Sequence, residues 1–289
     1  MLRPPTECSR PRDLRYNGAE RAFLRPPTDR ADFAAPATVT RLGVSAVVIT
    51  FNEEERLRDC LESLAWADEL IVVDAESSDK TVQIAREFTD RVWVRPWPGF
   101  ASQKNFALEQ ATRDWVLSVD ADEEVSPELR AEIGRVLEGR GEAADGYRIP
   151  RRNIFWGHWV RHGGLYPDWQ LRLFQRGRGQ FVDHAVHESV KVTGTVGRLG
   201  APLVHRSYRG VTDFLARADR YSTLAAEAWV RSGRPVRLSD LVLRPAGRFL
   251  GMYVARAGFL DGWRGFLLAA LYAYYVFVRS AKVWERARG

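Results

Sequence analysis

The chain has 289 residues, of which 45% are apolar and 11% aromatic, enough to bury one large core with or without a small appendage. Its two cysteines, Cys8 and Cys60, lie far apart in different contexts, which argues against a disulfide framework and favours a reducing compartment. The formal net charge of +6 suits phosphate-bearing substrates or an anionic membrane surface. We expect no nucleic-acid partner, because the sequence lacks zinc-finger spacing, a basic zipper and an aromatic–basic RNA-binding pattern.

Residues 1–42 are predicted to form a disordered tail. They contain proline pairs and many arginines but no apolar period. They also lack the apolar stretch of a signal peptide, and no segment of the chain reaches roughly 18–20 uninterrupted apolar residues. We therefore expect the catalytic part of the protein in the cytoplasm.

From Val44 the chain alternates between short apolar segments and amphipathic segments. Strands are expected at 44–50, 69–74, 91–94 and 114–120, of which the first two read as buried, and helices from residue 52, from residue 77, at 100–112 and at 127–137. This repeated strand–helix pattern predicts an α/β fold with a mostly parallel, doubly wound sheet. Ligands bind beyond the carboxyl ends of such strands, where Thr50, Asp74 and Asp120 fall.

The pattern changes in the second half of the chain. Further strands are expected at 146–150, 170–174 and 189–192, and the chain turns helical from Val211. We therefore divide the ordered part into an α/β domain at 43–205 and a helical region at 206–289.

Asp120-Ala121-Asp122 follows the fourth expected strand. Two carboxylates at this spacing can share a divalent ion, and oxygen ligands favour Mg²⁺ or Mn²⁺. Such an ion would neutralise a nucleoside diphosphate and make it a better leaving group. The alternative is an acidic loop, or a helix cap ahead of Pro127.

Asp74 ends the second expected strand, where its carboxylate could accept a hydrogen bond from a nucleobase or a ribose hydroxyl. The alternative is that this stretch only caps the next helix, which Ser78 and Asp79 could do without a ligand.

The three motifs together carry a resemblance. Thr50-Phe51-Asn52-Glu53-Glu54, Asp74-(x4)-Asp79-x-Thr81 and Asp120-x-Asp122 resemble, in order and spacing, those of family 2 glycosyltransferases, which have the Rossmann-like GT-A fold. The resemblance covers residues 44–192 and implies a metal at Asp122. One departure is that Ala75 and Glu76 replace the family's second acid and glycine, so the base contact falls to Asp74. The residues expected to bind the nucleotide-sugar are Thr50, Asn52, Glu54, Asp74, Lys104 and Asp120.

The helix containing Lys104 resembles the family's helix before the metal motif. Lys104 could approach the donor phosphates, or it could be a solvated helix lysine.

The second half resembles a subgroup that includes lipopolysaccharide-core β-glucosyltransferases. The motifs are Trp156-Gly157-His158-Trp159, His162-Gly163-Gly164, the run from Tyr166 to Phe174, and Val186-His187-Glu188. The resemblance implies inverting transfer of a sugar such as glucose to a hydroxyl of a lipid-linked saccharide, with His187 as a further metal ligand. A structural aromatic–histidine network is the alternative reading of the clustered histidines.

Inverting transfer needs a base that takes the proton of the acceptor hydroxyl, and a carboxylate can do this. Glu188 is the favoured candidate and Asp168 the alternative. Arg172 could hold a carboxylate or a phosphate, or be structural.

The chain ends in an apolar and aromatic run at 266–278, with arginines before and after it. Tryptophan, tyrosine and flanking arginine favour a membrane interface, so we expect peripheral contact with the inner face of the cell membrane. The alternative is a helix packed on the α/β domain.

Two rival functions remain. A haloacid-dehalogenase phosphatase also uses Asp-x-Asp, but places it on the first strand rather than the fourth. A catalytically degenerate GT-A protein would bind nucleotide or membrane without turnover, and the presence of Asp120, Asp122 and Glu188 argues against it.

Overall fold

The computed structural model describes residues 41–183 and 188–287. The expected tail at 1–42 therefore lies almost wholly outside the described residues, as do Cys8 and His187. Cys60 is buried with a free thiol.

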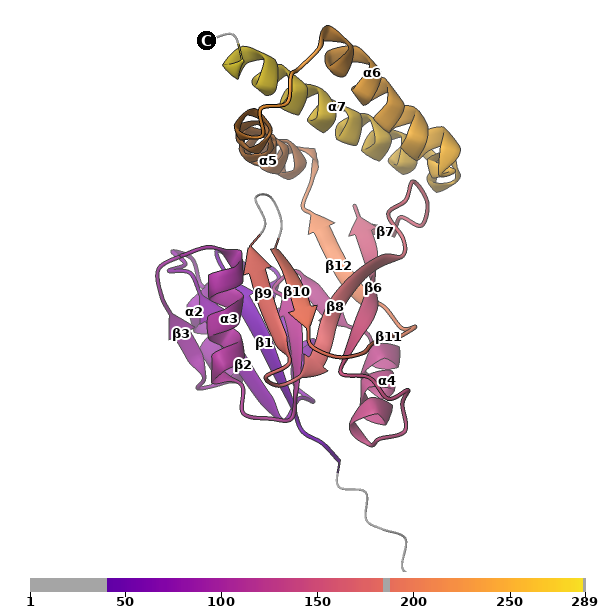
Figure 1. Cartoon of the computed structure of the whole chain (residues 1–289). Helices are drawn as coiled ribbons and strands as arrows, with labels where there is room; N and C mark the ends of the chain where they lie inside the picture. The colour runs from indigo at the N-terminus through magenta and orange to yellow at the C-terminus, as the bar shows by residue number, and fades with distance from the viewer. Residues whose placement is uncertain (1–40, 184–187, 288–289) are drawn as a thin grey trace, which may run out of the picture. The chain divides into compact units, whose positions relative to one another are not determined.

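Four parallel strands form the first part of the large sheet, as the sequence pattern predicts (Figure 1). They are β1 (Val44–Thr50), β2 (Glu69–Asp74), β3 (Val92–Val94) and β4 (Trp115–Asp120), in the order β3-β2-β1-β4. The pairing aligns Thr50 with Asp74 and Ile49 with Asp120. The polar ends of these three neighbouring strands therefore meet at one edge of the sheet.

Helices cover both faces of these strands. On one face, α1 (Leu57–Leu64) and α4 (Pro127–Leu137) join a core with Val48, Val72 and Leu117. On the other face, α3 (Phe100–Gln110) packs its alanines against Val47 and Ile71. Because both faces are buried, the strands read in the sequence as continuous apolar runs.

The second part of the sheet is mixed. β8 (Asp168–Gln175) pairs antiparallel with β4 and with β6 (Gly146–Phe155), and β12 (Leu203–Tyr208) pairs parallel with β6. β5 (Glu123–Val125) joins β12 antiparallel, and β7 (His158–Trp159) and β11 (Val196–Arg198) pair with β6. A separate antiparallel pair consists of β9 (Gly179–Asp183) and β10 (Glu188–Val192). The parallel half is thus extended by strands of both directions.

Two helices begin later than the sequence pattern suggests. The helix expected from Asn52 is α1 and begins at Leu57, and the helix expected from Ser77 is α2 (Thr81–Phe88). Asn52 has a φ of 53°, so the chain turns there instead of entering a helix. The residues that resemble helix caps instead join the two loops: Asn52 N donates to Ser77 Oγ, and Ser78 N donates to Asn52 Oδ1.

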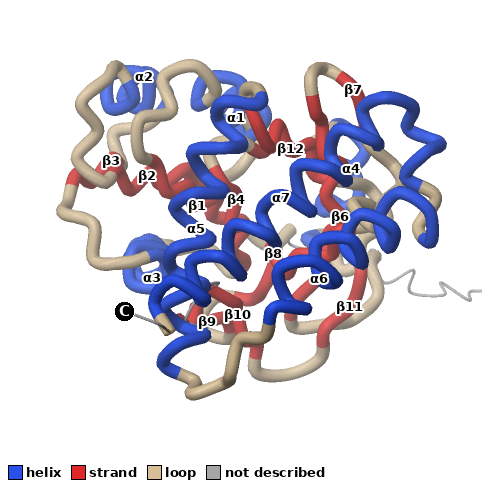
Figure 2. Tube along the Cα trace, turned by 90° about the horizontal axis from the view of Figure 1, so that it is seen from above, coloured by secondary structure: helices blue, strands red, loops and turns tan. Residues whose placement is uncertain are grey.

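The chain ends in three long helices, α5 (Val211–Arg231), α6 (Leu238–Leu250) and α7 (Gly262–Arg286). A π-helical turn, η1 (Gly251–Ala255), and a 3-10 turn, η2 (Gly258–Asp261), connect α6 to α7. Figure 2, the view from above, shows these helices lying across the ends of the strands. α7 packs on α5 and α6, and its Leu268 joins Phe155 and Val160 in a small core.

The segment Gly258–Arg286 is the one described helix that is long and apolar enough to cross a membrane. That property is weak evidence, because core helices share it, and a third of its most apolar window is buried within the protein.

Candidate functional site

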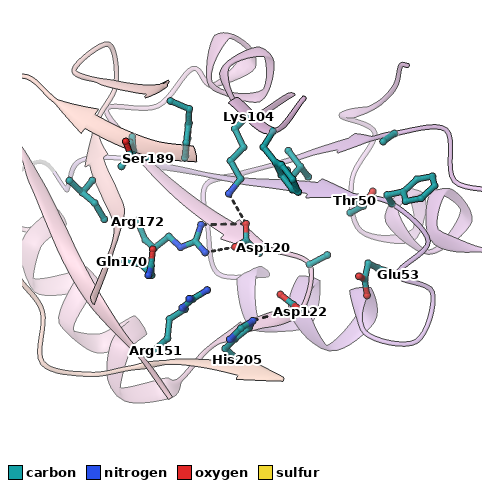
Figure 3. Close-up of a pocket in the computed structure, with 18 of the residues that line it drawn as sticks. Thr50, Glu53, Lys104, Asp120, Asp122, Arg151, Gln170, Arg172, Ser189 and His205 are labelled. Atoms are coloured by element: carbon teal, nitrogen blue, oxygen red, sulfur yellow. Dashed lines mark hydrogen bonds and ion pairs between the residues drawn. The ribbon is translucent and has the colours of Figure 1, made fainter. Parts of the chain in front are cut away.

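A pocket of about 980 Å³ lies where the carboxyl ends of β1 and β4 meet the second part of the sheet. Side chains from β1, α3, β6, β8, β12 and α5 line it, together with the turn after β4 (Figure 3). Among the predicted residues, Thr50, Lys104, Asp120 and Asp122 belong to this lining. The fold therefore brings residues from three separate sequence motifs to one cavity.

Asp120 is held by two buried cations. Lys104 Nζ lies 2.9 Å from Asp120 Oδ1, and Arg172 donates from both terminal nitrogens to the same carboxylate (Figure 3). Burial acts to raise the pKa of Asp120, but Arg172 and Lys104 outweigh it and hold that pKa well below the usual aspartate range. Asp120 is therefore an anion throughout the neutral range.

The same contacts settle two alternatives left open by the sequence. Lys104 is only 4% exposed, so it is not a solvated helix lysine. Arg172 is 5% exposed and also donates to Glu123 Oε1 at 2.7 Å, so it pairs with carboxylates. Burial opposes its charge, but Asp120 and Glu123 outweigh the burial and raise its pKa.

Asp122 faces His205, a residue of β12 that the sequence did not single out. Asp122 Oδ2 lies 3.4 Å from His205 Nε2 and 3.7 Å from Arg56 Nη1. Burial raises the pKa of Asp122, but the contact with His205 more than offsets this and the pKa falls. The clustering of all five histidines between residues 158 and 205 was the only sequence signal for His205.

The hydrogen bonds behind His205 orient its ring. Asn153 Nδ2 donates to Leu165 O at 2.8 Å, which leaves Asn153 Oδ1 as the acceptor 2.7 Å from His205 Nδ1. Ser207 Oγ lies 2.9 Å from the same Nδ1. These contacts use Nδ1, so Nε2 is the ring nitrogen that faces Asp122. One ring nitrogen and one carboxylate oxygen thus face each other inside the pocket.

Glu53 is a third acid in the pocket lining, beside Asp120 and Asp122, and was not among the predicted site residues. Burial raises its pKa, and the charge of Asp122 raises it further, although Arg56, Arg209 and Arg217 oppose the shift. Glu53 Oε2 is buried and lies 3.5 Å from Arg209 Nη2. Its signal in the sequence was its place inside the Thr50–Glu54 motif, where its neighbours were chosen instead.

Asp74 lies behind the pocket lining. Its side chain is fully buried and accepts hydrogen bonds from Thr50 Oγ1 at 2.8 Å, Ser77 N at 2.8 Å and Ser77 Oγ at 2.5 Å. Both carboxylate oxygens therefore have partners within the protein. The geometry joins the ends of β1 and β2, whereas the predicted nucleobase contact is untested.

Asn52 and Glu54 make similar contacts between loops. Asn52 Oδ1 accepts from Ser78 N at 2.9 Å, and Glu54 Oε2 accepts from Lys80 N at 3.1 Å. Of the predicted donor-binding residues, Asn52, Glu54 and Asp74 thus organise the loops beside the pocket, while Thr50, Lys104 and Asp120 line it.

The two candidate bases lie in different environments. Asp168 opens β8, and Arg151 donates to its Oδ2 from Nε at 2.8 Å, while Gln170 Nε2 donates to its Oδ1 at 2.8 Å. Burial raises the pKa of Asp168, but these partners outweigh it and lower the pKa. Glu188 opens β10, next to Ser189 and Val190 of the pocket lining, whereas its side chain lies outside the described residues.

The sequence matches Glycosyl transferase family 2 over residues 45–192. The lipopolysaccharide core biosynthesis glycosyltransferase LpsC of Rhizobium meliloti is 33% identical over 256 residues, which cover 86% of this chain and 94% of that protein. An uncharacterized glycosyltransferase of Rickettsia typhi, RT0209, is 30% identical over 253 residues, 84% of this chain and 87% of that protein.

Two solved structures are similar at lower identity. The mannosyltransferase PcManGT of Pyrobaculum calidifontis, in complex with GDP-Man and Mn²⁺, has a TM-score of 0.49 at 16% identity, over 86% of this chain and 89% of that one. TarS 1–349 of S. aureus, in complex with UDP-GlcNAc, has a TM-score of 0.46 at 18% identity, over 86% and 92%. The family match and the full-length relatives agree with the motifs at the ends of β1, β2 and β4: this chain is a transferase that belongs to glycosyl transferase family 2.

Proposed function

We propose that the protein transfers a sugar from a nucleotide-sugar to a hydroxyl of a lipid-linked saccharide, with inversion at the anomeric carbon. The observation that carries the proposal is the placement of Asp120, Asp122 and His205 around one pocket at the carboxyl end of β4. The relative from Rhizobium meliloti supports lipopolysaccharide core as the acceptor class, and the motifs of the second half favour glucose as the sugar.

A divalent cation, Mg²⁺ or Mn²⁺, fits the donor atoms of Asp122 and His205. Ligand bonds of about 2.0–2.2 Å to a shared ion bring two neighbouring ligands to roughly 3 Å, close to the observed 3.4 Å. Among the described residues no group of three or more His, Cys, Asp or Glu side chains gathers at a metal-binding distance. The remaining ligands would be donor phosphate oxygens, water and the predicted His187.

Two bonds change in the proposed reaction. The acceptor oxygen forms a bond to the anomeric carbon as the bond from that carbon to the diphosphate breaks, and the nucleoside diphosphate leaves. When bound, the cation neutralises charge on the departing diphosphate. Lys104 and Arg172 lie against Asp120 in the same pocket and add positive charge beside the leaving group.

Glu188 is our candidate for the base that takes the proton of the acceptor hydroxyl. Its competitor Asp168 is bound by Arg151, and its lowered pKa makes it a weaker proton acceptor. The backbone of Glu188 opens β10 beside the pocket lining, which supports this choice.

The acceptor also bears on location and organisation. A lipid-linked saccharide would be presented at the cytoplasmic face of the membrane, where we place the enzyme as a peripheral protein. Within this proposal, residues 43–205 bind the donor and the helical region at 206–289 contacts the membrane.

The test is donor binding across UDP-, GDP- and ADP-sugars by calorimetry, with and without Mn²⁺. We expect one donor to bind only with the metal, and Asp122→Asn to remove that binding. A folded protein that binds no donor, or binds one equally well without metal, would contradict the proposal and favour the degenerate reading. Transfer is then followed with the matching donor and extracted lipopolysaccharide core acceptors.

A further inference from the structure

The exposed apolar side chains of the helical region concentrate on α6 and the turns that follow it. Leu238, Val242, Leu243 and Leu250 of α6 are between 55% and 67% exposed. Val254 of η1 and Leu260 of η2 are 57% and 61% exposed. We call these six residues the α6 surface. Such a concentration on a protein surface marks a place where something else binds.

The four leucine and valine residues of α6 share one side of the helix. At about 100° per residue, Leu238, Val242, Leu243 and Leu250 fall within an arc of about 140°. Asp240 is buried and lies outside this arc, whereas Phe249 lies near one edge of it and contacts Phe266 of α7. Among the long helices, α6 packs mainly on α7, while α7 packs on both α6 and α5 (Figure 1). The helix is therefore amphipathic with its apolar side turned outwards.

The same segment concentrates the positive charge of the protein. Residues 231–282 contain nine Arg and Lys against two acids, a net charge of +7, compared with +6 for the whole chain. Both acids have partners, because Asp240 binds Arg244 and Asp261 binds His162. The remainder of the chain is thus slightly negative, and the cations flank the α6 surface.

We propose that the α6 surface seats in the interface of a bilayer rich in anionic lipids, with the α6 axis parallel to the membrane plane. Apolar side chains with flanking arginine form the pattern of helices that lie in the headgroup region. Arg256, exposed between η1 and η2, is placed to meet the lipid phosphates. Trp263, 60% exposed at the start of α7, adds an aromatic side chain of the kind enriched at that depth.

Two other occupants fit the observations less well. A spanning α7 would have to leave its contacts with Phe155 and Phe214, and Lys282 would lose Asp219, Ser222 and Thr223. A second copy of the chain would bring the same positive segment against itself, because a two-fold interface pairs identical surfaces. An anionic bilayer complements both the apolar arc and the charge.

Membrane binding through the α6 surface would also orient the pocket relative to the bilayer, an inference that rests on the proposed function. Arg217, Arg220 and Tyr221 of α5 line the pocket, and α5 packs on α7, which carries α6. The helical wall of the pocket therefore lies on the membrane side, where a lipid-linked acceptor would arrive.

The test is flotation of the full chain with vesicles of phosphatidylcholine, with or without phosphatidylglycerol. We expect flotation with the anionic vesicles, and a loss of partitioning of about tenfold or more for Leu243→Glu and Leu250→Glu. Arg256→Gln should weaken partitioning by about fivefold. The matched control Val196→Glu adds the same charge at a 41% exposed valine of β11 and should float like the parent.

Unchanged flotation of Leu243→Glu and Leu250→Glu would overturn the proposal. So would a dimer, seen by analytical ultracentrifugation, that Leu243→Glu dissociates, or a protein that leaves membranes only with detergent. Donor binding by calorimetry separates this proposal from the transferase function. Leu243→Glu should bind donor normally while losing vesicles, whereas a parent protein that floats but binds no donor contradicts the transferase alone.

Discussion

The two parts of the large sheet contribute to the pocket in different ways. β1 and β4 deliver Thr50, Asp120 and Asp122 at their carboxyl ends, within short motifs. β8 delivers Arg172, which lies 52 residues along the chain from its partner Asp120. β12 delivers His205, which lies about 80 residues from its partner Asp122. The first part places the acids, and the second supplies the groups that decide the charge around those acids.

The largest expected effect is that of Asp122→Asn, which removes an acid supplied by the first part of the sheet. If Asp122 binds the metal, this change should lower the rate of transfer by about 10³-fold with little loss of folding. The rate is measured with the donor identified by the binding panel, and the fold by circular dichroism. Asp114→Asn, beside the other end of β4, is the matched control and should keep its rate. A variant of Asp122 that retains most of its transfer would show that the β4 motif is not the centre of the site.

The contact between the two parts is tested by Arg172→Met. Removal of the buried guanidinium leaves Asp120 and Glu123 without their shared partner, so the free energy of unfolding should fall by about 3 kcal/mol. Urea unfolding at neutral pH measures the change. Arg176→Met, one residue beyond β8 on an exposed side chain, should cost far less. Equal losses in both variants would mean that the Arg172 cluster contributes nothing special to stability.

Prediction from sequence succeeded where structure follows from local patterns. β1 to β4 are continuous apolar runs and α4 has the bounds expected for it, since Ser126 caps it and Pro127 begins it. It was less accurate at Asn52 and Ser77. These two residues, 25 positions apart, form a hydrogen bond with each other instead of capping the helices that follow them. No local pattern reports such a contact.

His205 was missed for the same physical reason. Its role depends on Asp122, on the amide of Asn153 and on the pairing of β12 with β6, all of them long-range. The expectation of a metal at Asp122 rested on two acids after a strand and on the resemblance of the motifs, which suggested His187 as a further ligand. Those motifs carry no sign of the strand pairing that brings His205 to Asp122.

His205→Ala tests what the second part of the sheet contributes to the pocket. We expect the concentration of Mn²⁺ needed for half-maximal donor binding to rise by about 10- to 100-fold, while the fold is kept. His162→Ala is the matched control, because His162 also lies beside a carboxylate, 3.0 Å from Asp261, but outside the pocket lining. Identical metal dependence in the two variants would remove His205 from the ligand set.

The smallest expected effect concerns Glu53. The pKa of Glu53 lies above the ordinary 4.5. At pH values between the pKa in the unfolded chain and the pKa in the native state, the native state binds more protons, so the free energy of unfolding falls as pH rises. Glu53→Gln should remove this slope and raise the free energy of unfolding at pH 7. Urea unfolding at several pH values provides the measurement, with the exposed Glu62→Gln of α1 as control. A slope that persists in Glu53→Gln assigns it to another group.

β12 is the last strand of the sheet to be synthesised, yet it enters between β6 and β5 and carries His205 to the acids after β4. Folding of the parallel half during synthesis would therefore yield a platform with its carboxylates in place but with one wall of the pocket and His205 still missing. Such a nascent chain has no complete cavity in which a reactive donor could be held. The protein would become catalytically competent only late in synthesis, after Tyr208 has left the ribosome and β12 has joined the sheet.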